Sequence, residues 1–260
     1  MKNFLREFIY FGLKQAYACL FGGILLLTIL LTKFFWSDDI PIARYDFLFI
    51  AAIFIQILLV TFKLETAREV KIIFLFHIVG TLMEIFKTHV GSWSYPEDNL
   101  IRLWGVPLFS GFMYSAVGSY IARIWRIFDF KFEHYPPKYL TIILCILIYV
   151  NFFSHHYLPD IRYLLFIAIL SIYGRTKIHY TPYKKTRWMP LTIGFLLVSF
   201  FIWIAENIRT FGAAWVYPDQ KNGWDIVSID KMGSWFLLMI ISFVLVTLIN
   251  KVEKISKYNG

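Results

Sequence analysis

The sequence predicts an all-α protein, a polytopic bundle of about eight transmembrane helices. Of its 260 residues, 58% are hydrophobic and 17% are charged. A soluble chain of this length could not bury so much apolar surface, whereas a bilayer accepts helices that are apolar all round. The second observation is a duplicated motif. "EIFKTHVGSWSYPE" at Glu84–Glu97 recurs without a gap as "ENIRTFGAAWVYPD" at Glu206–Asp219.

The apolar runs predict where the spans lie. The first run extends well past the length of a signal peptide, and no small-x-small cleavage site follows it, so it is predicted to be a retained helix. The run at 161–173 is short, because a crossing needs roughly 17–25 residues, and a re-entrant segment is the alternative there. The eight predicted spans are 13–35, 45–62, 72–86, 106–127, 139–153, 161–173, 191–208 and 232–249.

The basic residues predict the orientation. With eight spans, 18 Lys and Arg fall on the side of the two termini and 8 on the other side, so both termini are expected in the cytoplasm of a cell-membrane protein. The repeated motif then faces outward. The net charge of +9 does not indicate a nucleic-acid partner, since no basic patch with interleaved stacking aromatics is present. The expected partner of the basic loops is the lipid bilayer and its anionic headgroups.

The duplication predicts how the chain is organised. The 122-residue spacing maps the third predicted span onto the seventh and the fourth onto the eighth, and the earlier spans correspond less regularly. Residues 1–260 are therefore expected to form one integral membrane domain with two pseudo-repeat halves, about 1–131 and 132–260. Four spans per half give both halves the same orientation, with a symmetry axis along the membrane normal, as in parallel-repeat transporters.

The glutamates of the motif are the candidate catalytic residues. Ionisable residues within spans are costly and are functional candidates by default. If Glu84 and Glu206 converge on one cavity, one of two neighbouring carboxylates would be held protonated and could act as a general acid. The candidate substrate-binding residues share the motif or the same helix face: His77, Lys87, Thr88, Trp93, Tyr95, Arg209, Thr210, Trp215 and Tyr217.

A purely structural interpretation of the same residues stays open. In that interpretation the motif only forms the end of a membrane helix and does no chemistry. It would supply a snorkelling cation, a glutamate three residues earlier that pairs with it, a glycine at the chain reversal (Gly91 and Gly212) and an interfacial aromatic belt. His77 and His89 could join the glutamates around a metal, but no Glu-x-x-His or His-x-x-x-His spacing is present. No metal and no cofactor are predicted.

The stretch from Glu65 to Trp125, "ETAREVKIIFLFHIVGTLMEIFKTHVGSWSYPEDNLIRLWGVPLFSGFMYSAVGSYIARIW", resembles the YoaT-like bacterial integral membrane proteins. "ENIRTFGAAWVYPDQ" and "KMGSWFLLMIISFVLV" resemble the same family, so the likeness covers nearly the whole chain. It implies a class of uncharacterised membrane protein without an activity. A fainter similarity is to membrane carotenoid cyclases and hydratases, on Glu84, "GSWSYPE" and the "GVP" at 105–107; it implies protonation of an isoprenoid double bond by a carboxylic acid.

Three classes of function follow. The first is an enzyme that acts on a lipid or isoprenoid ligand within the membrane, with Glu84 and Glu206 as acid or base. The second is a small-solute transporter or carrier, which would have polar or helix-breaking residues near the middle of its spans; Gln56 and Asn151 are sparse exceptions to largely uninterrupted spans. The third is a structural or interaction protein of the membrane. The sequence leaves the substrate and the oligomeric state open.

Overall fold

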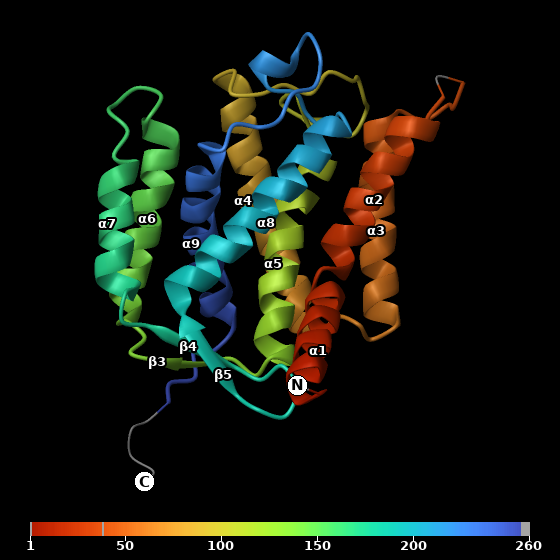
Figure 1. Cartoon of the computed structure of the whole chain (residues 1–260). Helices are drawn as coiled ribbons and strands as arrows, with labels where there is room; N and C mark the ends of the chain where they lie inside the picture. Colours follow the sequence, from red (N-terminus) through yellow and green to blue (C-terminus); the bar gives the residue numbers. More distant parts are fainter. Residues whose placement is uncertain (1, 38, 256–260) are drawn as a thin grey trace. The chain divides into compact units, whose positions relative to one another are not determined.

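The computed structural model describes residues 2–37 and 39–255, and it is mostly helical (Figure 1). Met1 and residues 256–260, parts of the predicted cytoplasmic ends, lie outside the described residues. Nine α-helices are described: α1 (Lys2–Ala18), α2 (Leu20–Phe35), α3 (Arg44–Thr61), α4 (Ala67–His89), α5 (Phe109–Ile127), α6 (Lys138–Ser154), α7 (Arg162–Tyr173), α8 (Leu191–Phe211) and α9 (Lys231–Ile249).

A helix occupies each position at which a span is predicted, but fewer helices have the length and composition of a crossing. Among the described residues, α3, α8 and α9 are long and apolar enough, and α1 with α2 would add a fourth if the pair forms one crossing. Helices α6 and α7 are apolar but shorter. These helices are consistent with a membrane protein, whereas eight crossings and the orientation of the termini stay predictions.

The first predicted span is not one continuous helix. The chain breaks at Cys19, between α1 and α2. Two glycines, Gly22 and Gly23, follow the break and lower the helix propensity there. Within the described chain, the Tyr17 carbonyl just before the break accepts a hydrogen bond from Arg123 Nη1 at 3.0 Å. The run predicted to be one retained helix therefore consists of two helices, α1 and α2.

The structure also contains strands that an all-helical prediction leaves out. Strands β1 (Arg102–Leu103) and β2 (Val106–Pro107) pair in antiparallel fashion. A second antiparallel sheet has the order β3-β4-β5. Its strands are β3 (Lys131–Glu133), β4 (Lys177–Tyr180) and β5 (Arg187–Pro190), so the most basic predicted loop is a hairpin. Strands of two to four residues are too short to show the alternation by which strands are predicted.

The chain divides into two compact units. Unit 1 contains residues 1–18, 121–202 and 229–260, and unit 2 contains 19–120 and 203–228. The units do not follow the predicted halves, since each unit draws on both. All residues of the duplicated motif belong to unit 2, which is therefore the part that positions the candidate site.

Helix α3 of unit 2 is apolar where it is exposed and carries buried charges, the reverse of a helix in a soluble protein. It exposes Ile50, Phe54 and Ile57 while it buries Arg44 and Asp46. A buried charge is costly unless it is paired and hydrogen-bonded, and an exposed apolar face suits a lipid environment. This polarity supports placing unit 2 in a bilayer.

Helix boundaries follow fixed spacings along the chain. Helices α5 and α9 begin and end 122 residues apart, and so do the last residues of α4 and α8. Helices α3 and α7 both begin with an Arg-Tyr pair, at Arg44 and at Arg162, a spacing of 118. A duplication with a four-residue length difference between the copies would leave these spacings. The repeat itself stays a prediction.

Both glutamate-bearing helices end in the same turn, on the predicted glycine after α4 but not after α8. After α4, Gly91 has φ +73°, and its N–H donates to Thr88 O while the next N–H donates to Lys87 O. After α8, the equivalent residue is Ala213, with φ +53° and matching hydrogen bonds. This is the Schellman arrangement, in which glycine is favoured. The prediction of Gly212 at the reversal is off by one residue.

We expect Ala213→Gly to stabilise the protein by about 1 kcal/mol, because a Cβ disfavours the left-handed conformation. Gly91→Ala should destabilise the protein by a similar amount. An added Cβ there would meet no atom within 4 Å, so the whole effect would come from the left-handed backbone conformation. Thermal unfolding in detergent checks both. A fall in unfolding temperature for Ala213→Gly would contradict the assignment of this turn.

Candidate functional site

Glu84 is buried near the end of α4 and accepts hydrogen bonds from three aromatic side chains. Only 3% of its surface is exposed. Its Oε2 accepts from Trp93 Nε1 at 2.7 Å and from the Tyr95 hydroxyl at 2.5 Å. Its Oε1 accepts from the Tyr114 hydroxyl on α5 at 2.7 Å. These donors hold the carboxyl in one orientation.

Glu206 on α8 repeats the central part of this arrangement. It is 1% exposed and accepts a hydrogen bond from the Tyr217 hydroxyl. Tyr217 follows Glu206 by eleven residues, as Tyr95 follows Glu84. Trp215 is buried as well, and its Nε1 makes no hydrogen bond of full geometry within the described chain. Each copy of the motif thus folds its tyrosine back onto its own glutamate.

The two copies of the motif are joined through equivalent residues. Ser94 and Val216 form an antiparallel bridge, with N–H···O distances of 3.0 and 2.9 Å in the two directions. Because these two positions correspond in the repeat, the bridge has the local symmetry of a twofold axis. The rings of Trp93 and Tyr217 also meet edge to face, with centroids 6.0 Å apart. Consequently Glu206 is an electrostatic neighbour of Glu84.

Two buried cations accompany the two carboxylates. Lys87 is 4% exposed and Arg209 is 7% exposed. The guanidinium of Arg209 interacts electrostatically with the carboxyl of Glu206, on the same helix, and with that of Glu84. Buried ions are tolerated when opposite charges and hydrogen bonds compensate them. With both carboxyls ionised, the two carboxylates and the two cations have no net charge.

The tyrosines of the motif stay protonated and act as hydrogen-bond donors to these carboxyls. Burial, and next the neighbouring charge of Glu84, raises the pKa of the Tyr95 hydroxyl well above its ordinary value. Burial and then Glu206 raise the pKa of the Tyr217 hydroxyl in the same way. Neither phenol ionises at physiological pH, so both keep donating a hydrogen bond to the carboxyl beside them.

The remaining predicted residues are Thr88, Thr210 and His77. Thr88 is partly buried, and its hydroxyl has no hydrogen-bond partner among the described atoms. Thr210 accepts a hydrogen bond from Trp224 Nε1 at 3.1 Å and donates to the Asn207 carbonyl. His77 lies two helical turns before Glu84 and packs against Phe112, with ring centroids 4.4 Å apart.

Tyr114 is the site residue that sequence reasoning missed. Its counterpart in the second half is Phe236, so a comparison of the two copies gives no signal at this position. Arg44 was missed for a similar reason, although the matching Arg-Tyr pair at 162 could have marked it. Its guanidinium donates to the Gly212 and Ala213 carbonyls and pairs with Glu97 at 2.7 Å, so it links the end of the first motif copy to the turn within the second.

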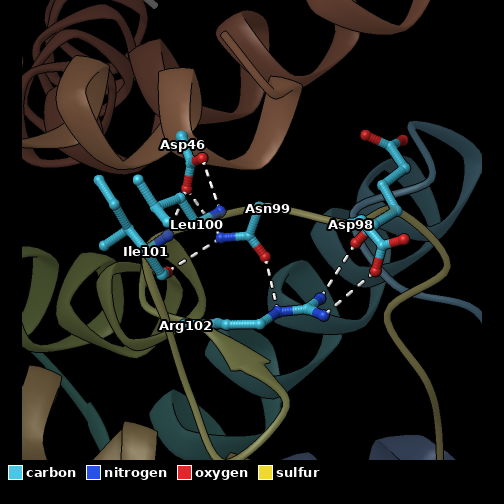
Figure 2. Close-up of polar contacts among 7 residues, drawn as sticks. Asp46, Asp98, Asn99, Leu100, Ile101 and Arg102 are labelled. Atoms are coloured by element: carbon cyan, nitrogen blue, oxygen red, sulfur yellow. Dashed lines mark hydrogen bonds and ion pairs between the residues drawn. The ribbon is translucent and has the colours of Figure 1, made fainter.

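An acidic residue at the start of α3 anchors the loop that follows the first motif (Figure 2). Asp46 accepts hydrogen bonds from Asn99 Nδ2, Leu100 N and Ile101 N, each at 2.8 Å. Arg102 Nε in turn donates to Asn99 Oδ1 at 2.9 Å. Charge-assisted hydrogen bonds of this kind fix the loop backbone and, with it, the Trp-x-Tyr-Pro segment beside Glu84.

The described residues contain no group of three or more His, Cys, Asp or Glu side chains that could hold a metal ion. His89 is exposed at the end of α4, and His77 lies two turns away from Glu84 along the helix. The ligands that this cluster offers are therefore two carboxyls, two cations and several aromatic N–H and O–H donors.

The fold and this cluster define a helical protein of the membrane class with acidic residues buried in its interior. The chain belongs to the family described as "Protein of unknown function (DUF817)", whose pattern it matches over residues 7–243. It is 40% identical over 250 residues to the "Uncharacterized protein YoaT" of Bacillus subtilis (strain 168), an alignment that covers 96% of this chain and 94% of that protein. The resemblance to YoaT-like proteins is thus confirmed. No solved structure matches.

Proposed function

We propose that unit 2 holds a membrane-embedded acid–base site in which Glu84 and Glu206 act together on a lipid or isoprenoid substrate. The observation that supports the proposal is that the two buried carboxyls belong to two copies of one motif, and that a bridge between Ser94 and Val216 joins these two copies. Two neighbouring carboxyls in a low-dielectric site can share a proton, and one of them can then serve as a general acid.

The aromatic surroundings favour an apolar substrate that develops positive charge. Trp93 and Tyr95 contact Glu84, Tyr217 contacts Glu206, and Trp215 is buried in the same motif. Protonation of a carbon–carbon double bond forms a C–H bond from the π electrons and leaves a carbocation, while the donor becomes a carboxylate. Aromatic faces and the second carboxylate both stabilise such a cation. An isoprenoid double bond therefore suits this cluster better than a polar group.

A carrier is the second candidate, and the break in the first predicted span favours it. Discontinuous helices are characteristic of transporter binding sites, and the chain interrupts its helix at Cys19. In that case the glutamate pair would bind the coupling proton. The two functions differ in what changes in the cell: an enzyme alters a lipid, whereas a carrier alters the uptake of a solute.

The test compares lipid extracts of cells that express the chain with those of cells that lack it, by mass spectrometry, together with uptake of labelled solutes by the same cells. The proposal predicts that a lipid or isoprenoid species accumulates without the protein and falls again on its re-expression. Unchanged lipids with altered uptake would refute the enzyme and support the carrier. If neither changes, both functions are refuted and the structural interpretation is favoured.

A further inference from the structure

Helix α1 is held along one face by the β4–β5 hairpin, and both belong to unit 1. Arg187 Nη2 of the hairpin donates to Glu7 Oε2 at 2.6 Å. Two turns further along α1, Lys14 Nζ donates to the Thr181 carbonyl in the hairpin at 2.8 Å. Residues seven positions apart lie on the same side of a helix, so both charged side chains of this face are directed to the hairpin.

The face of α1 that points away from the hairpin is apolar and exposed. Leu5, Ile9 and Leu13 follow one another at four-residue spacing, which places them on one side of the helix, and Phe8 lies beside them. All four side chains are exposed. A crossing helix is usually apolar all round, whereas a helix with one charged and one apolar face is typical of the membrane interface. The residues of α1 therefore favour a helix that lies in the plane of the membrane.

The hairpin that packs on α1 is basic. Residues 175–187 contain five Lys and Arg side chains, and no acidic residue occurs from residue 161 to residue 205. The rings of Tyr183 and Trp188 are exposed among these cations, and Tyr183 stacks on Tyr10 of α1 with ring centroids 4.4 Å apart. Lysine and arginine attract anionic headgroups, and exposed tryptophan and tyrosine are typical of the membrane interface. The charge and the aromatic rings of the hairpin therefore complement an anionic lipid surface.

The hairpin is close enough to act on a leaflet that the apolar face of α1 enters. An interfacial helix buries its apolar face about 5–10 Å into the boundary between headgroups and acyl chains, and a helix with its side chains is about 10–12 Å across. The hairpin on the other side of α1 would thus lie at the level of the headgroups or just above them. Because the Debye length is about 10 Å at 0.1 M salt, the exposed Lys184 and Lys185 would still attract anionic lipid from there.

We propose that α1 lies in the interface of an anionic leaflet as an amphipathic anchor and forms no part of a crossing. Its apolar face enters the boundary of the acyl chains, and the hairpin binds the phosphate groups of anionic phospholipids from the headgroup side. The separation of α1 from α2 supports this arrangement, since the chain breaks at Cys19 and the two helices belong to different units. The proposal does not depend on acid–base chemistry at Glu84 and Glu206, because an anchor needs no reaction.

The first test measures the depth of α1 at three exposed points, with Leu5→Cys, Ile9→Cys and Leu13→Cys made one at a time. The full-length chain also carries Cys19→Ser and Cys145→Ser, so a fluorophore labels only the new thiol. The vesicles contain phosphatidylglycerol and phosphatidylcholine in equal parts, with a nitroxide quencher either near the headgroup or near the end of the acyl chain. The expected ratio of shallow to deep quenching exceeds one and is the same at all three positions. In a crossing helix it would change, because eight residues extend about 12 Å through a hydrocarbon core of about 30 Å.

The second test measures whether anionic lipid gathers beside the hairpin. A label at Ile9→Cys should be quenched more by nitroxide phosphatidylglycerol than by phosphatidylcholine with the nitroxide on the same carbon. Replacing Lys184 and Lys185 together by Gln should remove most of this excess, and about 1 M salt should abolish it, because the Debye length is then about 3 Å. Lys221→Gln neutralises an exposed cation in a loop of unit 2 and should leave the excess unchanged.

Three results would overturn the proposal. A quenching ratio that changes steadily from Leu5 to Leu13 would show that α1 crosses the bilayer. Equal quenching by the two nitroxide lipids, or an excess that the double lysine variant leaves intact, would exclude anionic lipid as the partner. Labels that are shielded from both quenchers and quench one another would assign the apolar face to a second copy of the chain. All of these measurements are independent of lipid conversion, so the anchor and the proposed enzyme stand or fall separately.

Discussion

Replacing Glu84 and Glu206 together by Gln is expected to abolish the lipid conversion while the chain stays folded. Gln keeps the shape of the side chain and can still accept a hydrogen bond from Tyr95 or Tyr217, but it cannot carry the proton. General acid–base catalysis contributes about 10²–10⁴-fold, so a loss of at least about 100-fold is expected. The measurement is the amount of the changed lipid at matched levels of folded protein.

Asp219→Asn is the matched control for this double variant. Asp219 belongs to the same motif but is exposed, so its neutralisation should leave the lipid conversion unchanged. Loss of folded protein in the double variant, in proportion to the loss of conversion, would instead assign the glutamates a structural role.

Gly80→Ala is expected to give the second large effect. An added Cβ would lie 2.6–2.7 Å from three atoms of the Tyr114 side chain, which include its own Cβ, so the tyrosine cannot simply rotate away. Overpacking of this kind costs about 1–3 kcal/mol. It would also displace the Tyr114 hydroxyl from Glu84. We expect a lower unfolding temperature in detergent and a reduced lipid conversion.

Gly23→Ala on α2 is the control, because a Cβ there meets no atom within 4 Å. Alanine also has the higher helix propensity, so this variant should be neutral or slightly stabilising. If Gly80→Ala were as stable as Gly23→Ala, the close packing of α4 on Tyr114 would be wrong.

The duplication made much of the site predictable from the sequence. Trp93 and Tyr95 recur as Trp215 and Tyr217 in fixed register with a glutamate, which an interfacial belt would not require. In the structure, Trp93 and Tyr95 bond to Glu84, and Tyr217 bonds to Glu206. Whether they act on a substrate stays a prediction.

Other features could not be predicted because they depend on tertiary contacts. Tyr114 has no tyrosine counterpart in the second half. Its hydroxyl reaches the Glu84 carboxyl only because α5 packs on α4. The break at Cys19 and the left-handed turn at Ala213 are backbone events without a Pro or Gly at the residue itself. The short strands β1 to β5 lack the length to show a period.

The most direct test of the paired site is a double-mutant cycle on lipid conversion with Glu84→Gln, Glu206→Gln and the double variant. Groups that act as a unit show strongly non-additive effects. The account predicts that either single variant loses nearly as much conversion as the double variant. Losses that multiply, or a single variant with full conversion, would contradict a shared site.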